Sequence, residues 1–267
     1  MAIHVERREH VTLIELDSAE SMNALTVADL LALRNTLLAC QGDDAVRAII
    51  ITGAGTKAFC TGANLKATFP PEESFAAGLL KDRSQDAAQG GYTRLIDLSD
   101  LALWKPLIAA INGYCLGGGL ELALQCDLRI ASANASFALP EVKVASVPAA
   151  GGMQYLLRAI PAAHAMKLAL TGARIDAEEA LRIGLVSDVY PGTDLRDEAF
   201  ELANQIASNG PLAVQMVKKL ALETAHQAPA EFTAHANLAW GLLRNTEDRI
   251  EGRKAFGEKR PPVYRGR

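Results

Sequence analysis

The stretch GYCLGGGLELALQCD, residues 113–127, restricts what this chain can fold into more than any other part of it. Three consecutive glycines suit the interior of neither a strand nor a helix, because glycine loses the most backbone freedom on folding. A single carboxylate, Glu121, follows in an otherwise apolar run, and an unpaired carboxylate is costly to bury. The glycines therefore indicate a joint between two regular elements, and Glu121 indicates a site beside that joint.

Composition and charge narrow the class of protein. The 267 residues are 49% hydrophobic and 22% charged, which is typical of a globular protein with a sizeable core. A formal net charge of −4 argues against a general nucleic-acid binder. No apolar stretch reaches the roughly 18 residues that span a membrane, and the charged first ten residues do not resemble a signal peptide. We therefore expect a cytoplasmic protein without a membrane or nucleic-acid partner.

The cysteines do not indicate a metal site. Cys40, Cys60, Cys115 and Cys126 form no CxxC pair, and no cluster of cysteine and histidine has zinc spacing. We expect all four to be thiols in a reducing compartment, with no bound metal.

The order of elements predicts two regions. Over residues 1–193 strand-like and helix-like runs alternate, beginning with a hairpin candidate and a helix that Thr26 and Asp29 begin as a capping box. From Asp194 onward every segment has a helical pattern. We therefore predict an α/β core over 1–193 and a helical C-terminal region over 194–267.

The sequence GAGTKA at residues 53–58 matches the residue pattern of a dinucleotide-binding loop, but its surroundings in the sequence do not fit one. Such a loop must open a helix, whereas FCTGANL follows here, with Phe, Cys, Thr and Gly in place of a first helical turn. The pattern favours a turn after a strand, and a nucleotide-dependent oxidoreductase is the weakest alternative.

The glycine triplet lies between a strand, LIAAING, and a helix that begins with LELAL. Backbone N–H groups at such a joint lie open to a ligand, because no side chain covers them. A second small-residue loop, FCTGANLK at 59–66, places the N–H of Ala63 where it is able to face the same point. Two converging N–H donors form an oxyanion hole, which stabilises negative charge on a carbonyl oxygen.

A second carboxylate, Glu141, follows a strand and a proline, 20 residues after Glu121. Two carboxyl groups beside one oxyanion hole are suited to acid–base chemistry next to a carbonyl. The structural alternative is that Glu121 only begins a helix and Glu141 only caps a loop.

Here the sequence resembles the crotonase superfamily, the enoyl-CoA hydratase/isomerase proteins. The resemblance rests on motifs that occur in the order of that family over nearly the whole chain: NAL, AFCTGANLK, NGYCLGGGLELALQCDLRIAS, ASFALPEVKVASVPAAGG, LTGARIDAEEALRIGLV and KAFGEKR. It implies an α/β fold with a ββα spiral core and a helical C-terminal region that trimerises. It also implies a homotrimer, or a homohexamer built as a dimer of trimers.

The resemblance implies roles for single residues. Ala63 and Gly118 match the two residues whose N–H groups bind the thioester oxygen, and Glu121 and Glu141 match the catalytic glutamates that hold a water. The matches to positions along coenzyme A are Thr61, Lys66, Phe256 and Lys259, the last two reaching it from a neighbouring subunit in some members.

The implied function is reversible hydration of a 2-enoyl-CoA to a 3-hydroxyacyl-CoA, with no cofactor beyond the coenzyme A of the acyl-CoA substrate. Three alternatives stay open: an enoyl-CoA isomerase, a dehydratase like those for carnitinyl-CoA, and a non-catalytic CoA-binding subunit. Two departures from the family are Asn64, where Asp is common, and Ala149, where Gly is common. We interpret both as tuning, with the N–H of Ala149 still able to orient a glutamate.

Overall fold

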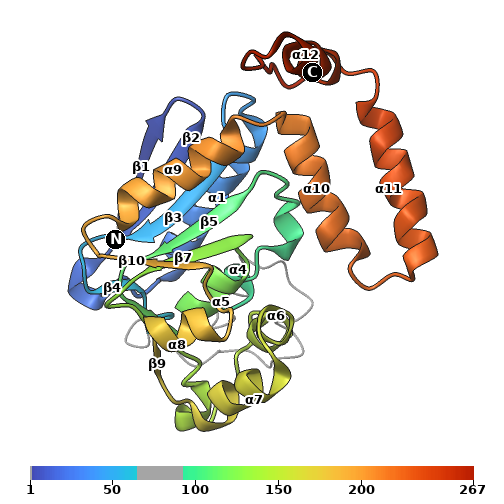
Figure 1. The fold of residues 1–267 in the computed structure, drawn as a ribbon. Helices are drawn as coiled ribbons and strands as arrows, with labels where there is room; N and C mark the ends of the chain where they lie inside the picture. Colours follow the sequence, from blue (N-terminus) through green and yellow to red (C-terminus); the bar gives the residue numbers. More distant parts are fainter. Residues whose placement is uncertain (1, 65–92) are drawn as a thin grey trace.

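The computed structural model describes residues 2–64 and 93–267, and its strands form two sheets (Figure 1). The larger sheet has the order β1-β2-β3-β5-β7-β10, with β1 antiparallel to β2 and the other neighbours parallel. The smaller sheet has the order β4-β6-β8-β9, with β9 antiparallel to β8. The strands are β1 Ala2–Arg8, β2 Val11–Asp17, β3 Ala48–Gly53, β4 Ala58–Cys60, β5 Leu107–Ile111, β6 Tyr114–Leu116, β7 Leu128–Ser132, β8 Ser136–Ala138, β9 Ile175–Asp176 and β10 Asp188–Tyr190.

The chain repeats one unit, a strand in the larger sheet, then a strand in the smaller sheet, then a helical turn. Strand β5 leads to β6 and the helix α5 (Gly118–Leu124), and β7 leads to β8 and the 3-10 turn η4 (Glu141–Val144). At the step between sheets Gly113 leaves no room for a side chain, since a Cβ there would lie 2.2 Å from the carbonyl oxygen of Lys57. This is the strand–strand–helix spiral predicted from the sequence.

Helices cover the sheets and enclose the core. They are α1 Val27–Gly42, α4 Thr93–Ile96, α6 Gly152–Ala159, α7 Ala162–Thr171, α8 Ala177–Arg182 and α9 Leu195–Ala207, with 3-10 turns at η1 Ala19–Ser21 and η3 Ser99–Leu101. The predicted cap of α1 is present, because Thr26 accepts from the Asp29 N–H and Asp29 accepts from the Thr26 N–H. Helix α9 packs on the face of the larger sheet opposite the main core.

Three further helices extend beyond the core: α10 Pro211–Thr224, α11 Pro229–Leu243 and α12 Glu247–Glu258 (Figure 1). Helix α10 is attached to the core by an ion pair of 2.8 Å between the buried Lys218 and the half-buried Asp127. Asp127 also accepts from the N–H of Leu107, so it has a structural role. The division at 193/194 stays a prediction, although α9 belongs with the core by its contacts.

The last residues fold back and fasten α12 to the start of β3. The Asp248 carboxylate, which is buried, accepts from the N–H groups of Arg265 and Gly266 at 2.6 and 2.8 Å. Arg47 donates to the Tyr264 carbonyl at 2.7 Å. The C-terminal segment therefore holds α12 in place through hydrogen bonds to the Asp248 carboxylate and to the backbone N–H of Asp248, which donates to the Arg267 carbonyl.

Candidate active site

The site lies where neighbouring parallel strands of the smaller sheet end. Cys60 in β4 pairs with Cys115 in β6, and Leu116 in β6 pairs with Ala138 in β8. Because the carboxyl ends of parallel strands meet at one edge, the loops after these strands converge there. This edge brings together residues 61–63, 117–118 and 139–141.

The first two loops touch through glycine. A Cβ on Gly62 would lie 2.8 Å from the nitrogen of Gly118, and a Cβ on Gly118 would lie 3.9 Å from the nitrogen of Ala63. Leu25 pairs with Ala63 through the flanking carbonyl of Gly62 and N–H of Asn64, so the N–H of Ala63 takes no part in that pairing. Within the described part of the chain, no oxygen accepts a hydrogen bond from the N–H of Ala63 or Gly118.

Gly117 makes this joint possible. Its φ of +54° and ψ of −128° lie in a region that only glycine adopts readily, and a Cβ there would lie 3.1 Å from Glu141 Oε1. The glycine triplet is thus required by the turn and by the carboxyl group beside it.

Glu121 is buried in the first turn of α5, at 3% exposure. Its Oε1 accepts from the N–H groups of Ala150 and Gly152, at 2.7 and 3.1 Å. Burial raises the pKa of this carboxyl from 4.5 to about 7; the two N–H groups lower it and the charge of Glu141 raises it further. A group of this kind is able to exchange a proton near neutral pH.

Glu141 begins the η4 turn directly after Pro140. Its Oε2 is buried and has no hydrogen-bond partner among the described residues, and burial raises the pKa of this carboxyl as well. A buried carboxyl oxygen without a partner is uncommon in folded proteins, which marks this atom as available to a ligand or water.

Both carboxyl groups face one cavity of about 290 Å³. Its lining combines residues from all the loops just described: Thr61, Ala63, Ile96, Gly117, Gly118, Glu121, Pro140, Glu141, Lys143, Val144, Ser146, Val147 and Ala149. Five residues singled out from the sequence therefore share one cavity: Thr61, Ala63, Gly118, Glu121 and Glu141.

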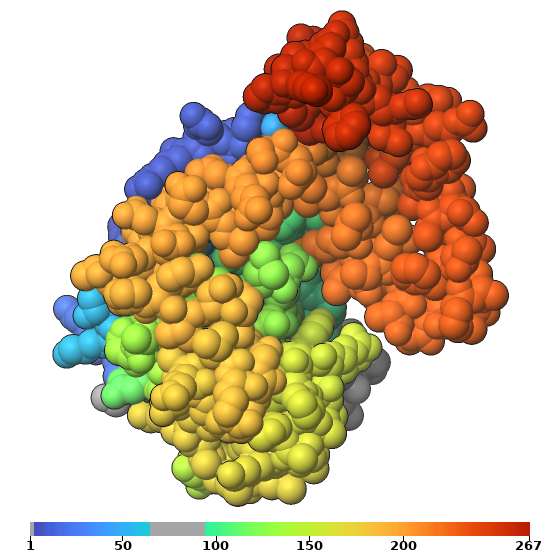
Figure 2. Space-filling view, in the orientation of Figure 1, coloured from blue at the N-terminus to red at the C-terminus, as the bar shows by residue number. Residues whose placement is uncertain are grey.

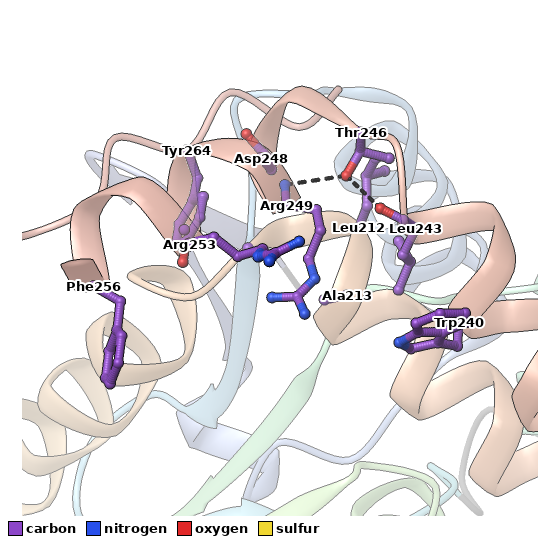
Figure 3. Close-up of a pocket in the computed structure, with 12 residues that line it drawn as sticks. Leu212, Ala213, Trp240, Leu243, Thr246, Asp248, Arg249, Arg253, Phe256 and Tyr264 are labelled. Carbon is purple, nitrogen blue, oxygen red and sulfur yellow. Dashed lines mark hydrogen bonds between the residues drawn. The ribbon is translucent and has the colours of Figure 1, made fainter.

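Of the other three predicted residues, Lys66 falls outside the described residues, and Phe256 and Lys259 do not line this cavity. Phe256 and Lys259 lie at the end of α12, where Phe256 is 88% exposed. Figure 3 shows Phe256 and Trp240 at opposite ends of a separate, larger hollow of about 590 Å³. Their contact with coenzyme A, from the same chain or from a neighbouring subunit, stays a prediction.

The sequence reasoning missed the residues that orient Glu121. The sequence pointed to Ala149 as a residue whose N–H is able to orient a glutamate, whereas the donors to Glu121 are Ala150 and Gly152. A Cβ on Gly152 would lie 2.8 Å from Glu121 Oε1, so the glycine permits the hydrogen bond. The run of small residues in PAAGG was the available signal.

Two other expectations are confirmed. Cys60 and Cys115 are buried free thiols, and burial raises the pKa of both, to about 12 for Cys60, so neither is a ready nucleophile. The glycine pattern at 53–58 leads into strand β4 and not into a helix, so it lacks the geometry of a dinucleotide loop.

Neither a cluster of metal ligands nor a membrane-spanning helix is found among the described residues. Among residues 2–64 and 93–267, no group of three or more His, Cys, Asp or Glu side chains is placed to hold a metal ion. None of the helices described there has both the length and the apolar character needed to cross a bilayer.

Known proteins match the chain over its full length. The (E)-benzylidenesuccinyl-CoA hydratase of Thauera aromatica is 47% identical over 266 residues, covering 100% of both chains. The carnitinyl-CoA dehydratase of Proteus mirabilis is 39% identical over 272 residues, covering 100% of this chain and 99% of the other. A crystal structure of an enoyl-CoA hydratase from Bacillus anthracis superposes with a TM-score of 0.88 at 39% identity, covering 99% of each chain.

The model of the enoyl-CoA hydratase/isomerase family matches residues 6–267. This match spans both sheets, the two glutamates and the C-terminal helices, so it agrees with the strand–strand–helix spiral and the cavity described above. The chain belongs to the enoyl-CoA hydratase/isomerase family, the crotonase superfamily.

Proposed function

We propose that this protein catalyses the reversible addition of water to the double bond of a 2-enoyl-CoA, giving a 3-hydroxyacyl-CoA. The observation that carries the proposal is the pair of carboxyl groups, Glu121 and Glu141, at one cavity with the N–H groups of Ala63 and Gly118, from which no oxygen of the described residues accepts a hydrogen bond. An isomerase needs to move only a proton, whereas addition of water needs one group to accept a proton and another to donate one.

In this mechanism the thioester oxygen accepts hydrogen bonds from the N–H groups of Ala63 and Gly118. These donors stabilise the enolate that forms as water attacks, and a single such donor contributes roughly 2.7–4 kcal/mol in well-studied cases. Gly62 places no side chain against the N–H of Gly118, since a Cβ there would lie 2.8 Å from its nitrogen.

The two carboxyl groups divide the proton transfers. Ionised Glu121 accepts a proton from the water whose oxygen bonds to C3, and protonated Glu141 donates its proton to C2. Burial favours the protonated form of both groups, and their mutual repulsion favours a state in which the pair holds a single proton. That state supplies one base and one acid, and dehydration uses the same groups in reverse.

The remaining predicted residues are proposed to bind coenzyme A. Thr61 lines the cavity, and Lys66 follows the Ala63 loop in the chain. Phe256 and Lys259 are proposed to reach the coenzyme of a neighbouring subunit, in a homotrimer or a dimer of trimers. Exposed apolar side chains on the last helices support this assembly, among them Leu238, Trp240, Leu242, Ile250 and Phe256, each at least 58% exposed.

A bulky acyl group is the favoured substrate within this class. Val144 and Val147 line the cavity and are 68% and 67% exposed, so an apolar substituent has two open side chains to cover. The relative of 47% identity is a benzylidenesuccinyl-CoA hydratase, whose substrate name indicates an aromatic ring. Crotonobetainyl-CoA is the second candidate, on the strength of the carnitinyl-CoA dehydratase likeness.

Turnover on a panel of enoyl-CoAs, with each product identified by mass and by chromatography, tests the proposal. The panel contains crotonyl-CoA, cinnamoyl-CoA, benzylidenesuccinyl-CoA and crotonobetainyl-CoA, with 3-enoyl-CoA for the isomerase. A product heavier than the substrate by one water supports hydration. A shifted double bond without added water identifies an isomerase, and tight binding without turnover identifies a non-catalytic subunit.

A further inference from the structure

One wall of the cavity comes from a segment that the proposed mechanism does not use. Ile96, at the end of α4, lines the cavity but is only 1% exposed. A Cβ on Gly118 would lie 2.7 Å from Ile96 Cδ1, so the isoleucine fills the space that the glycine leaves empty. Ile96 is thus the apolar neighbour of a proposed oxyanion donor.

Gln125 holds the backbone around Ile96 from α5, one helical turn after Glu121. Its side-chain nitrogen donates to the carbonyl of Ile96 at 2.9 Å and to the carbonyl of Glu121 at 3.0 Å. Its side-chain oxygen accepts from the N–H of Leu98 at 2.7 Å. One amide therefore joins the element that carries the glutamate to the element that carries the isoleucine.

Arg34 holds the same segment from α1. Its guanidinium donates to the carbonyls of Leu95 and Asp97, at 3.3 and 2.7 Å, and forms an ion pair of 2.5 Å with Asp100. The Arg34 side chain is 10% exposed, so these bonds are shielded from water. Arg34 and Gln125 together bind the carbonyls of three successive residues, 95 to 97, and the N–H of the next.

Four backbone groups in a row are bound by these two side chains: the carbonyls of residues 95, 96 and 97 and the N–H of Leu98. Such a network of shielded hydrogen bonds makes a segment rigid, so Arg34 and Gln125 hold Ile96, at the end of α4, in one position.

We propose that Ile96 is a specificity-determining residue, which limits the width of the acyl group beside the Gly118 N–H, and that Gln125 and Arg34 are its positioning residues. This inference rests on the proposed binding of an enoyl thioester at Gly118. Shortening Ile96 opens the cavity toward wider acyl groups, and removing a clamp lets the side chain retreat with the same effect.

The test compares kcat/KM for cinnamoyl-CoA with kcat/KM for crotonyl-CoA in each variant. Ile96→Ala is expected to raise the ratio of the two by about tenfold or more, the scale of discrimination by a few methylene groups. Ile96→Val should give a smaller rise in the same direction and protects the test if the alanine variant folds poorly. Gln125→Met, of similar length but without hydrogen bonds, should raise the ratio and the KM for crotonyl-CoA.

Leu95→Ala is the matched control. Leu95 precedes Ile96 in the same helix and is equally buried at 1%, but it does not line the cavity. It should lower the melting temperature as Ile96→Ala does and leave the ratio within twofold of the unaltered protein. An unchanged ratio in both Ile96 variants, or an equal rise in Leu95→Ala, overturns the proposal.

Binding measurements separate this inference from the proposed reaction. Dissociation constants for butyryl-CoA and 3-phenylpropionyl-CoA, measured by calorimetry, need no turnover. If the unaltered protein hydrates no enoyl-CoA of the panel, the proposed function fails, and the ratio of these two constants in Ile96→Ala still decides the role of Ile96. A ratio shifted toward the aromatic compound supports it, and an unchanged ratio contradicts it.

Discussion

The backbone nitrogen of Ala150 lies 2.7 Å from Oε1 of Glu121, and this bond opposes the burial that raises the pKa of the carboxyl. The balance leaves the pKa at about 7, against 4.5 for an ordinary glutamate. The folded protein therefore holds a proton on Glu121 more tightly than the unfolded chain does.

This difference predicts how stability depends on pH. The contribution of Glu121 to the free energy of unfolding is fully present below about pH 4.5 and is lost as pH rises to about 7 and above. At about 1.4 kcal/mol per unit of pKa, the loss amounts to roughly 3 kcal/mol. Urea unfolding between pH 5 and 8 should therefore show a shallower pH dependence for Glu121→Gln than for the unaltered protein, and equal slopes would refute the raised pKa.

Each of the two glutamates is expected to be essential for turnover. Glu121→Gln and Glu141→Gln should each lower kcat for the preferred enoyl-CoA by at least about 10²-fold, a usual contribution of general acid–base catalysis. Glutamine has nearly the same volume, so the fold should persist. Glu178→Gln, at an exposed position in the first turn of α8, is the control. Near-normal turnover in either test variant removes that residue from the mechanism.

Gly152 is expected to affect chemistry by way of Glu121. In Gly152→Ala the new methyl group would lie 2.8 Å from both Glu121 Oε1 and Pro148 Cβ, so the carboxyl must move away from its two N–H donors. Turnover should fall by at least tenfold. Gly42→Ala is the matched control, because nothing lies within 4 Å of a Cβ there. Equal kinetics for the two alanine variants would show that the placement of Glu121 tolerates the change.

Gly118→Val is expected to impair turnover far more than stability. A side chain there blocks the thioester from the N–H, and its Cβ first meets the end of the Ile96 side chain at 2.7 Å and then the Cα of Gly62 at 3.4 Å. The flexible isoleucine end is able to shift, which limits the cost to folding. Melting temperature and kcat are measured on the same preparation, and a large thermal loss with activity retained in the folded fraction contradicts an oxyanion role.

The C-terminal residues are tested best by single substitutions. Deleting residues 250–267 would also remove the hydrogen bonds of Asp248 and Arg47 that fasten the last helix. Phe256→Ser and Lys259→Ser leave those bonds in place, and each should weaken CoA binding several-fold in calorimetry. Light scattering measures the assembly in parallel. A trimer with unchanged affinity for coenzyme A would exclude both residues from the site.

Local patterns were enough to predict the main elements and the site's principal groups. The capping box of Thr26 and Asp29 and the glycine joint before Glu121 depend on residues close in sequence, so the pattern itself carries the information. The shared edge of parallel strands then explains why Ala63 and Gly118 meet.

What could not be predicted depends on contacts between distant segments. Ile96 lies at the end of α4, and the backbone there is bound by Arg34, 62 positions earlier, and by Gln125, 29 positions later. Which of the small residues in PAAGG point their N–H groups at Glu121 depends on the path of that loop, so the donors Ala150 and Gly152 could not be singled out. The place of Phe256 relative to coenzyme A depends on a second chain under the proposed assembly.

The hydrogen bonds of Asp248 and Arg47 to the last residues have a consequence for biosynthesis. The chain is made from its N-terminus, so Arg47 and Asp248 are synthesised before Tyr264, Arg265 and Gly266, to which they bind. Helix α12 becomes fastened only once translation has finished. Incomplete chains lack the final residues that hold this helix, so only full-length molecules have α12 in its fixed position.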